Sequence, residues 1–441
     1  MTDRKLTSPS PIPEGAETAK GRWYIVGLLT LLYGLSFIDR MILALLAQPV
    51  ALSLGLSDMQ LGLLMGAGFA VVYSLAGLPI AHFVDRGNRK LIVTLGVLCW
   101  SVLTVASAFA RDFSHLLVLR AGVAIGEAVL TPAAVSLIAD MFPRKARAAP
   151  TAVYASMSSI MASGSFVIGA AALGLSTAIQ HSTGLEPWRM TMVFVGAPGI
   201  LVAAIFYFTT REPIRRMIGG VVVHASIGEG IAHLRKNWKL YAGFFLGAGI
   251  NVSMAHALIS WIPTILVRQQ GMETAQAGLV AGMVGLTGGL TAATLWPLLT
   301  AWLDKRGRPE GVLISMTLAC IVSGVSLVCI GLAPNVQLQI AAAYFGMTGV
   351  AAQGAIGTLV IQVFGVPALR ARLTSVYLVF TSLLGQAAGP ILVVFFSETQ
   401  GSAVTALSYG VAMTGLVAGI LSTLLYGFSA LSARHAVVQE T

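Results

Sequence analysis

Four charged residues lie in stretches that are otherwise apolar: Asp39 and Arg40 in one stretch, and Arg120 and Glu127 in another. A charge at the depth of a bilayer is energetically costly, so such side chains face protein or water and have partners. Arg120 and Glu127 are nearly two helical turns apart, so they share one helix face, about 10 Å apart along its axis. This set, here called the central cluster, has the chemistry to exchange protons and to bind an anion.

The expected geometry of the central cluster follows from the depth of each residue. Counted from the middle of each apolar stretch, Asp39 lies between Arg120 and Glu127 in depth, so we expect these three side chains to meet across one cavity. Successive residues of a helix diverge by about 100°, so Asp39 and Arg40 cannot point the same way. We expect Asp39 to face the cavity beside Glu127, and Arg40 to reach sideways to another helix or to substrate.

This arrangement predicts a role for each member of the central cluster. Burial favours a protonated carboxyl group, whereas a nearby arginine favours the ionised form, so movement of the arginine changes the protonation state. We therefore expect Asp39 and Glu127 to serve in proton coupling, and Arg40 and Arg120 to serve in substrate binding. The alternative is a static set of buried ion pairs that fixes the helix packing.

The composition places these residues in a membrane protein. Of 441 residues, 56% are hydrophobic and 10% are charged, and the mean hydropathy is +0.84, values that indicate a polytopic membrane protein rather than a soluble one. The net charge of +10 resides mostly in short loops, which argues against nucleic-acid binding. Because the sequence has no nucleotide-binding loop, metal-ligand cluster or nucleophile–base pair, we expect no enzyme, no catalytic residue, no metal and no cofactor.

Apolar segments predict twelve membrane spans. The spans are expected at 22–49, 58–83, 91–110, 113–140, 150–176, 188–209, 240–267, 273–302, 311–332, 338–365, 370–396 and 403–428. Twenty-two of the 27 Lys and Arg residues lie in the tails and in alternate loops on the side of the two termini. Since basic residues concentrate on the cytoplasmic side, we expect both termini in the cytoplasm and the protein in the inner (plasma) membrane.

The longest connection divides the chain into two halves. We expect a bundle over 22–209, a cytoplasmic linker over 210–239 and a second bundle over 240–428, with cytoplasmic tails at 1–21 and 429–441. The linker is polar enough to lie on the membrane surface, partly as an amphipathic helix. Each half is then a unit of six spans, which is a common plan for transporters.

An internal repeat supports this division. VDRGNRK follows the second span and LDKRGRP follows the eighth. An Asp at a helix end, with basic neighbours, can pair with the N-terminus of an adjacent helix and hold one side of a transporter shut. The residues expected to form this conformational latch are Asp85, Arg86, Arg89, Lys90, Asp304 and Arg308. The alternative is that the basic residues only anchor the topology.

The first of these loops resembles the loop between helices two and three of the major facilitator superfamily, G-x-x-x-D-R-x-G-R-K, with Ala81 and Asn88 in place of two glycines. D-R-x-N-R-K, the run RAGVAIGEA at 120–128 and IDR at 38–40 resemble the spinster branch of that superfamily. The resemblance implies an all-α polytopic membrane protein of twelve transmembrane helices in two pseudo-symmetric six-helix bundles. It also implies that spans one, four, seven and ten line a central cavity, and that the substrate is an amphiphilic anion such as a lysophospholipid or sphingosine phosphate, with proton coupling.

The polar groups in the middle of the spans of the second half are neutral or weakly basic. We expect Asn251, His256 and Gln353 to contact substrate, although a lone His is as often a packing residue. The expected partners are an amphiphilic small molecule, protons and membrane lipids, with no nucleic acid, and the protein is expected to act as a monomer. The alternative functions are a proton-coupled exporter of drugs or small organic anions and, from a different class, a lipid scramblase or a membrane sensor.

Overall fold

The computed structural model describes residues 19–213, 215, 227–366, 369–400 and 404–438. Within this part of the chain, twelve helical segments are long and apolar enough to cross a membrane, which confirms the predicted number of spans. The first bundle comprises α1 (Ala19–Leu54), α2 (Asp58–Met65), α3 (Ala67–Arg86), α4 (Arg89–Ser107), α5 (Phe113–Glu127), α6 (Leu130–Met141), α7 (Ala148–Ala178), the short α8 (Gln180–Thr183) and α9 (Pro187–Thr209). The second comprises α11 (Trp238–Gln270), α12 (Thr274–Lys305), α13 (Gly311–Leu332), α14 (Val336–Val350), α15 (Ala352–Ile356), α16 (Leu359–Phe364), α17 (Arg370–Phe380), the π-helical η3 (Thr381–Gln386), α18 (Gly389–Ser397) and α19 (Ala406–Val438).

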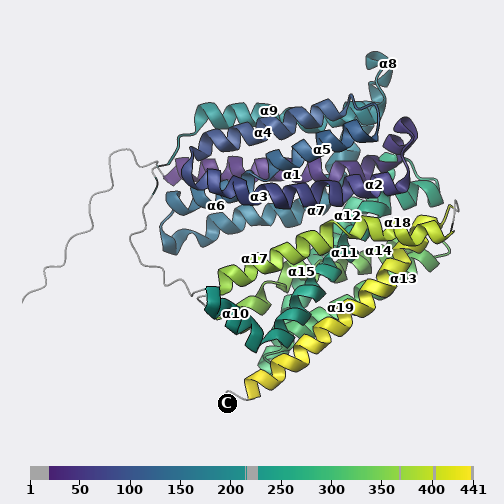
Figure 1. The fold of residues 1–441 in the computed structure, drawn as a ribbon. Coiled ribbons are helices and arrows are strands. Elements are labelled where there is room, and N and C mark those ends of the chain that lie inside the picture. Colours follow the sequence, from purple (N-terminus) through teal and green to yellow (C-terminus); the bar gives the residue numbers. More distant parts are fainter. Residues whose placement is uncertain (1–18, 214, 216–226, 367–368, 401–403, 439–441) are drawn as a thin grey trace, which may run out of the picture.

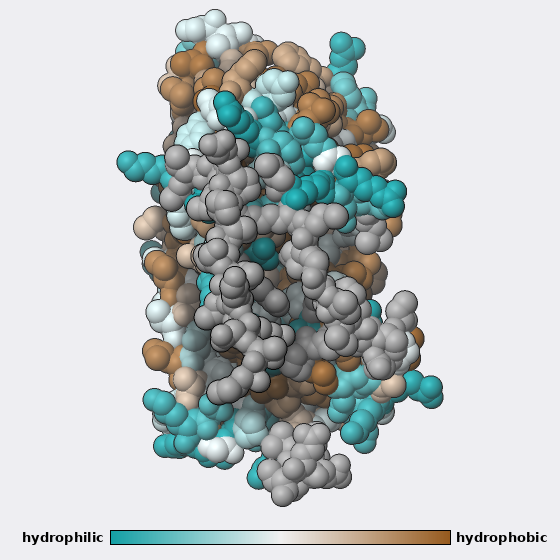
Figure 2. Space-filling model, turned by 90° about the vertical axis from the view of Figure 1, so that its left-hand side faces the viewer, coloured by the Kyte–Doolittle hydropathy of each residue, from teal (hydrophilic) through white to brown (hydrophobic). Residues whose placement is uncertain are grey.

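The helices form two bundles that lie side by side (Figure 1). Both ends of the described chain lie on one side, here called the terminal face, and α8 and the start of α2 lie on the other, here called the opposite face. The two bundles come close together near the opposite face and diverge toward the terminal face (Figure 1). Figure 2, which looks onto the terminal face, shows hydrophilic residues gathered in the upper and lower parts of this face.

A broken helix recurs at the same place in each half. The fourth span breaks after α5 and the tenth after α14, and each of these helices has 15 residues. Each begins with a side-chain cap, because Asp112 accepts a hydrogen bond from the His115 amide and Asn335 accepts one from the Leu338 amide. Such caps satisfy amide groups that have no partner in the first turn. In the first half the break directly follows Glu127, so this carboxylate lies at the end of α5.

The bundles touch through backbone near the opposite face. A Cβ added at Gly62 would lie 3.2 Å from the carbonyl oxygen of Pro390, and one added at Gly66 would lie 2.8 Å from that of Ala387. The glycines therefore allow the second span to approach the eleventh closely. In the described part of the chain, the hydrogen bonds that join the bundles involve Ser74 with Ser382 at 2.9 Å, and Arg268 on the opposite face.

The linker and the tails are described only in part. Helix α10 (Ile227–Lys236) lies at the terminal face, and His233 Nε2 lies 2.9 Å from the Tyr241 hydroxyl of α11. Residues 1–18, 214, 216–226 and 439–441 lie outside the described residues. The last helix continues to Val438, beyond the expected end of its span at 428, because hydropathy marks the length inside a membrane rather than the end of the hydrogen-bonded helix.

Candidate functional site

The central cluster forms two separate ion pairs. Arg120 Nη1 lies 3.0 Å from Asp39 Oδ1, and Arg40 Nη2 lies 2.8 Å from Glu127 Oε2. Asp39, Arg120 and Glu127 are each 2% exposed, so their charges are removed from solvent. The structure therefore brings together all four residues that the sequence indicates. It pairs each arginine with one carboxylate, whereas we expected one arginine between two carboxylates.

Two hydroxyl groups complete the coordination of the carboxylates. Ser36, one turn before Arg40 on α1, donates to Glu127 Oε2 at 2.7 Å. Thr104 of α4 donates to Asp39 Oδ2. Hydrogen bonds to an ionised carboxylate stabilise the charged form. Sequence reasoning missed both residues, because a single Ser or Thr in an apolar span has no distinguishing pattern.

The orientation expected for Asp39 was wrong, whereas Arg40 reaches another helix as expected, at Glu127 of α5. A small central cavity, with a volume of about 20 Å³, is lined by Arg40 from the first bundle and by His256, Ser260 and Gln386 from the second. Asp39 points instead toward α4 and α5, within its own bundle. The angle of about 100° between successive residues does separate the two side chains, but it is position 40 that faces the other bundle. The cavity has room for about one water molecule.

Aromatic rings surround the Arg40 guanidinium. Its central carbon lies 5.2 Å from the ring centroid of Phe37, 4.9 Å from that of Phe69 and 4.9 Å from that of Tyr73. The faces of these rings attract a cation by about 0.5–2 kcal/mol each, depending on how well water is excluded. The rings and Glu127 together offset the cost of placing a charge between two apolar bundles.

Both ion pairs are incompletely satisfied. Within the described residues, the Nε atoms of Arg40 and Arg120 and the Oε1 atom of Glu127 are buried without a hydrogen-bond partner. Buried polar groups are nearly always paired in folded proteins, so each such atom calls for an explanation. Two free N–H donors and one free carboxylate oxygen can bind an anion and a proton, respectively, without first breaking an existing bond.

The polar residues expected in the second half are divided between two places. His256 lines the central cavity opposite Arg40. Gln353 is the centre of a buried network, since it accepts hydrogen bonds from Asn251 at 3.3 Å and from the Tyr426 hydroxyl at 2.7 Å, and donates to the Tyr377 hydroxyl at 2.8 Å. This network ties α11, α15, α17 and α19 together. Direct contact of Asn251 and Gln353 with substrate stays a prediction.

Arg89 is the best-connected member of the expected latch. Its side chain is fully buried and pairs with Asp140 and, at 2.8 Å, with Glu212. Glu212 also accepts a hydrogen bond from the Lys90 amide at 2.7 Å, at the start of α4. The loop after the second span is therefore bound to the end of α6 and to the beginning of the linker. These contacts lie within the first half of the chain and do not join the bundles.

Of the other members of the expected latch, Lys90 is half-buried and the remaining four are exposed. Asp85, Arg86, Asp304 and Arg308 all have exposed side chains at the terminal face. Within the described residues the Asp85 carboxylate has no hydrogen-bond or ion-pair partner. A latch that holds the terminal face shut would be released when the bundles diverge on that side, so this arrangement suits the role that we expect for Asp85.

Replacing Arg89 with Ala is expected to lower the free energy of unfolding by about 3–5 kcal/mol, because it removes the buried guanidinium that pairs with both Asp140 and Glu212. Thermal unfolding of the detergent-purified protein measures the change. Arg86→Ala is the matched control, since Arg86 is a neighbouring but exposed arginine, and it should change stability little. Equal stability of the two variants would contradict a structural role for the Arg89 contacts.

An ion pair joins the two bundles at the opposite face. Arg268 of α11 binds Asp58 of α2 through both carboxylate oxygens, each at 2.7 Å, and its Nε donates to Gln48 of α1. Two parallel charge-assisted hydrogen bonds fix geometry as well as adding energy. Sequence reasoning missed this opposite-face pair, because its members are 210 residues apart and lie at the ends of spans.

Asp58→Asn should weaken the opposite-face pair and raise the population in which that face is open. The pair is about a quarter exposed, so we expect an effect of about 1 kcal/mol, roughly a fivefold change in the ratio of states. Spin-label distances between the opposite-face ends of α2 and α11 measure it. Asp85→Ala is the comparison, because the latch role predicts a shift toward opening of the terminal face. Unchanged distances in Asp58→Asn would contradict the role of the pair.

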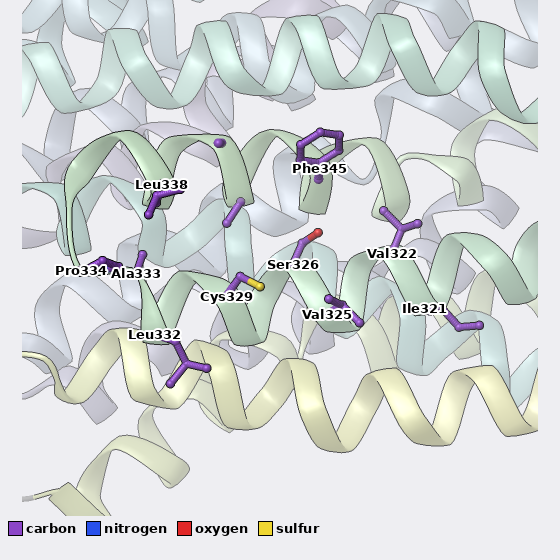
Figure 3. A pocket seen from close by; sticks show the side chains of 12 residues that line it. Ile321, Val322, Val325, Ser326, Cys329, Leu332, Ala333, Pro334, Leu338 and Phe345 are labelled. Atoms are coloured by element: carbon purple, nitrogen blue, oxygen red, sulfur yellow. The ribbon is translucent and has the colours of Figure 1, made fainter.

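A large apolar groove is remote from the central cluster. It has a volume of about 610 Å³ and lies between α13 and α14. Figure 3 shows Val325 and Cys329 of α13 facing this space below Leu338 and Phe345 of α14. No member of the central cluster lines the groove, so its apolar walls suit membrane lipid chains rather than the ionic chemistry described above.

Three comparisons place the fold among known proteins. The family model described as Major Facilitator Superfamily matches residues 29–390. An "MFS-type efflux pump" of Mycolicibacterium smegmatis is 28% identical over 431 residues, 95% of each chain. A probable galactarate/D-glucarate transporter of Bacillus subtilis is 26% identical and covers 73% of this chain and 72% of its own. The crystal structure of a bacterial homolog of the human lysosomal transporter Spinster, inward-facing and unoccupied, matches with a TM-score of 0.81 and 27% identity over 95% of this chain and 98% of that chain.

Proposed function

Because this chain belongs to the Major Facilitator Superfamily and is a transporter, we propose that it moves an amphiphilic anion across the inner (plasma) membrane by alternating access coupled to protons. The proposed substrate class is a lysophospholipid- or sphingolipid-like molecule. Asp39 and Glu127 are the proposed proton carriers, and Arg40 and Arg120 are the proposed anion-binding groups.

The observation that carries this proposal is the incomplete satisfaction of the central cluster. Glu127 has a buried oxygen free to take a proton, and Arg40 and Arg120 each have a buried N–H free to donate. Protonation of Glu127 removes the negative charge that holds Arg40, and Arg40 lines the cavity between the bundles. An anionic head group can then take the place of the carboxylate, so protons and substrate bind alternately to the same arginine.

The two walls of the cavity support an amphiphilic substrate. The first bundle contributes Arg40, and its other groups on this wall include Met41 and Phe69, whereas the second contributes His256 and Gln386. One wall therefore presents a positive charge beside apolar side chains, and the other presents neutral polar groups. A molecule with a negative head and an apolar body matches this pattern, and it is the substrate class that the resemblance of the sequence to spinster proteins implies. The cavity of about 20 Å³ has to widen before such a molecule binds.

A second candidate substrate is a small organic anion or a drug. The relatives include an efflux pump and a sugar-acid transporter, and a sugar acid shares its negative charge with a lysophospholipid head group. Such a substrate would use the same two arginines and would not need apolar surface. The test of the proposal must therefore compare the two classes directly.

The sidedness of the cycle follows from charge and from the contacts between the bundles. Basic residues on the terminal face favour a cytoplasmic location for that face, and the Arg268–Asp58 pair closes the opposite face. We infer that the structure is the inward-facing state, as in the Spinster homolog. In the outward-facing state, the latch residues Asp85 and Asp304, with their basic neighbours, are expected to close the cytoplasmic side.

Ligand-induced stabilisation of the purified protein tests the substrate class. A ligand that binds the folded state raises the unfolding temperature. At a ligand concentration of 100 times the dissociation constant, the free energy of unfolding rises by about 2.7 kcal/mol. We expect lysophosphatidylglycerol to stabilise the wild type and Arg40→Ala to lose this effect, with galactarate as the competing ligand. Stabilisation by galactarate alone would replace the lysolipid proposal by the small-anion alternative. Since lysolipids also act as detergents, Arg40→Ala serves as the specificity control.

A further inference from the structure

One aromatic ring lies beside both arginines of the central cluster. The centroid of the Phe69 ring is 4.9 Å from the guanidinium carbon of Arg40 and 5.5 Å from that of Arg120. Phe69 is 4% exposed and stacks on Tyr73, with centroids 5.8 Å apart. Among the described residues, Phe69 is the ring that contacts both guanidinium groups, so it is positioned to respond to either ion pair.

Phe69 also lies close to the contact between the bundles. It is three residues after Gly66, where the second span breaks between α2 and α3. A Cβ at Gly66 would lie 2.8 Å from the carbonyl oxygen of Ala387 in the eleventh span. The Phe69 amide donates to the Gly66 carbonyl at 3.2 Å, so one turn of helix connects the ring to the point of contact.

We propose that Phe69 is the positioning residue that couples the two ion pairs to the movement of the second span against the eleventh. This inference rests on the proposed proton-coupled function and adds the residue through which the charge state of the cluster reaches the interface. A cation–π contact depends strongly on the position of the cation. When Arg40 or Arg120 leaves its carboxylate for a substrate anion, the Phe69 ring follows the guanidinium and displaces the break at Gly66.

The aromatic neighbours of Arg40 provide a matched comparison. Phe37 also contacts the Arg40 guanidinium, at 5.2 Å, but it lies on α1 and not on the second span. Removing the Phe37 ring weakens a cation–π contact of similar length without altering the path to Gly66. A general loss of cation–π energy and a specific loss of coupling through Phe69 can therefore be separated.

The experiment measures the population of the two states as a function of pH. Spin labels at the cytoplasmic ends of α3 and α17 report the bundle separation in nanodiscs, at about pH 6 and about pH 8. The variants are Phe69→Leu, Phe69→Tyr, Phe37→Leu and Glu127→Gln. Counterflow exchange of labelled substrate at one fixed pH, with thermal unfolding, confirms that each variant is folded and binds.

We expect Phe69→Leu to remain folded in thermal unfolding but to reduce the pH-dependent change in the ratio of states by about fivefold, the size of one cation–π contact of roughly 1 kcal/mol. Phe69→Tyr, which keeps the ring, and Phe37→Leu should retain the wild-type change. A wild-type response in Phe69→Leu, or an equal loss in Phe69→Tyr or in Phe37→Leu, would overturn the coupling role.

Glu127→Gln separates this inference from the proposed function. If Glu127→Gln loses the pH response and Phe69→Leu keeps it, the cluster carries protons and the inference about Phe69 is wrong. If Glu127→Gln keeps the wild-type response, the proposed proton coupling itself fails. Should Phe69→Leu be too unstable to purify, Phe69→Met, which is apolar, flexible and lacks a ring, replaces it and must show the same loss.

Discussion

Replacing Glu127 with Gln is expected to remove the pH dependence of net transport while leaving substrate exchange intact. Glutamine matches the shape of the protonated acid, and its amide retains an oxygen to accept the Ser36 hydrogen bond that Glu127 receives at 2.7 Å. The variant therefore mimics a permanently protonated site, and Arg40 remains free for the anion. Proteoliposomes with labelled substrate measure both properties, with an imposed pH gradient for net transport and equal internal and external substrate for exchange.

The matched control for this variant is Glu186→Gln. Glu186 is also a glutamate paired with an arginine, Arg189 at 2.7 Å, but the pair lies at the start of α9, away from the central cluster. Its substitution should leave the pH dependence of transport unchanged. A wild-type pH profile in Glu127→Gln would show that Glu127 has a structural role and does not carry protons.

Arg120→Ala should abolish both substrate binding and transport and should also destabilise the protein. The substitution leaves Asp39, which is 2% exposed, without its counter-ion, at a cost of about 3–5 kcal/mol. Thermal unfolding and ligand-induced stabilisation separate the loss of stability from the loss of binding. We expect Arg120→Lys to be intermediate, because it restores a charge without the planar geometry of a guanidinium.

The double variant Asp39→Asn/Arg120→Ala separates the two effects of this substitution. It removes both charges of the pair, so most of the stability should return, whereas anion binding should stay absent. The coupling free energy follows from the double-mutant cycle, in which both single variants are also measured. Recovery of transport in the double variant would show that Arg120 serves only to neutralise Asp39.

The fold could be predicted from the sequence because its signals are local. Each span is a long apolar run, and the repeated loop sequences VDRGNRK and LDKRGRP mark the two halves. The break between Leu54 and Asp58 coincides with Gly55, whose φ of +66° favours glycine. The four charges of the central cluster could be found for the same reason, since a charge within an apolar run is visible without any knowledge of its neighbours.

The partners of those charges could not be predicted, because pairing depends on helix rotation and on contacts between distant segments. A rotation of about 100° decides whether Asp39 or Arg40 faces the cavity, and no apolar pattern fixes that rotation on a helix that is buried on most sides. The same limit applies to Thr104, which has no charge to mark it. Arg268 and Asp58 are charged, but both lie near the ends of spans. Charged residues are common there, so their presence does not indicate an ion pair.

Proton movement driven by substrate tests the central claim most directly. Proteoliposomes contain a pH-sensitive dye and wild-type protein, with no initial pH gradient, and lysophosphatidylglycerol is added on one side. If protons and substrate share the central cluster, addition of substrate changes the internal pH with wild-type protein and not with Asp39→Asn/Glu127→Gln, which still exchanges labelled substrate. Substrate uptake without any change of internal pH in the wild type, or an equal change in the double variant, would contradict proton coupling at Asp39 and Glu127.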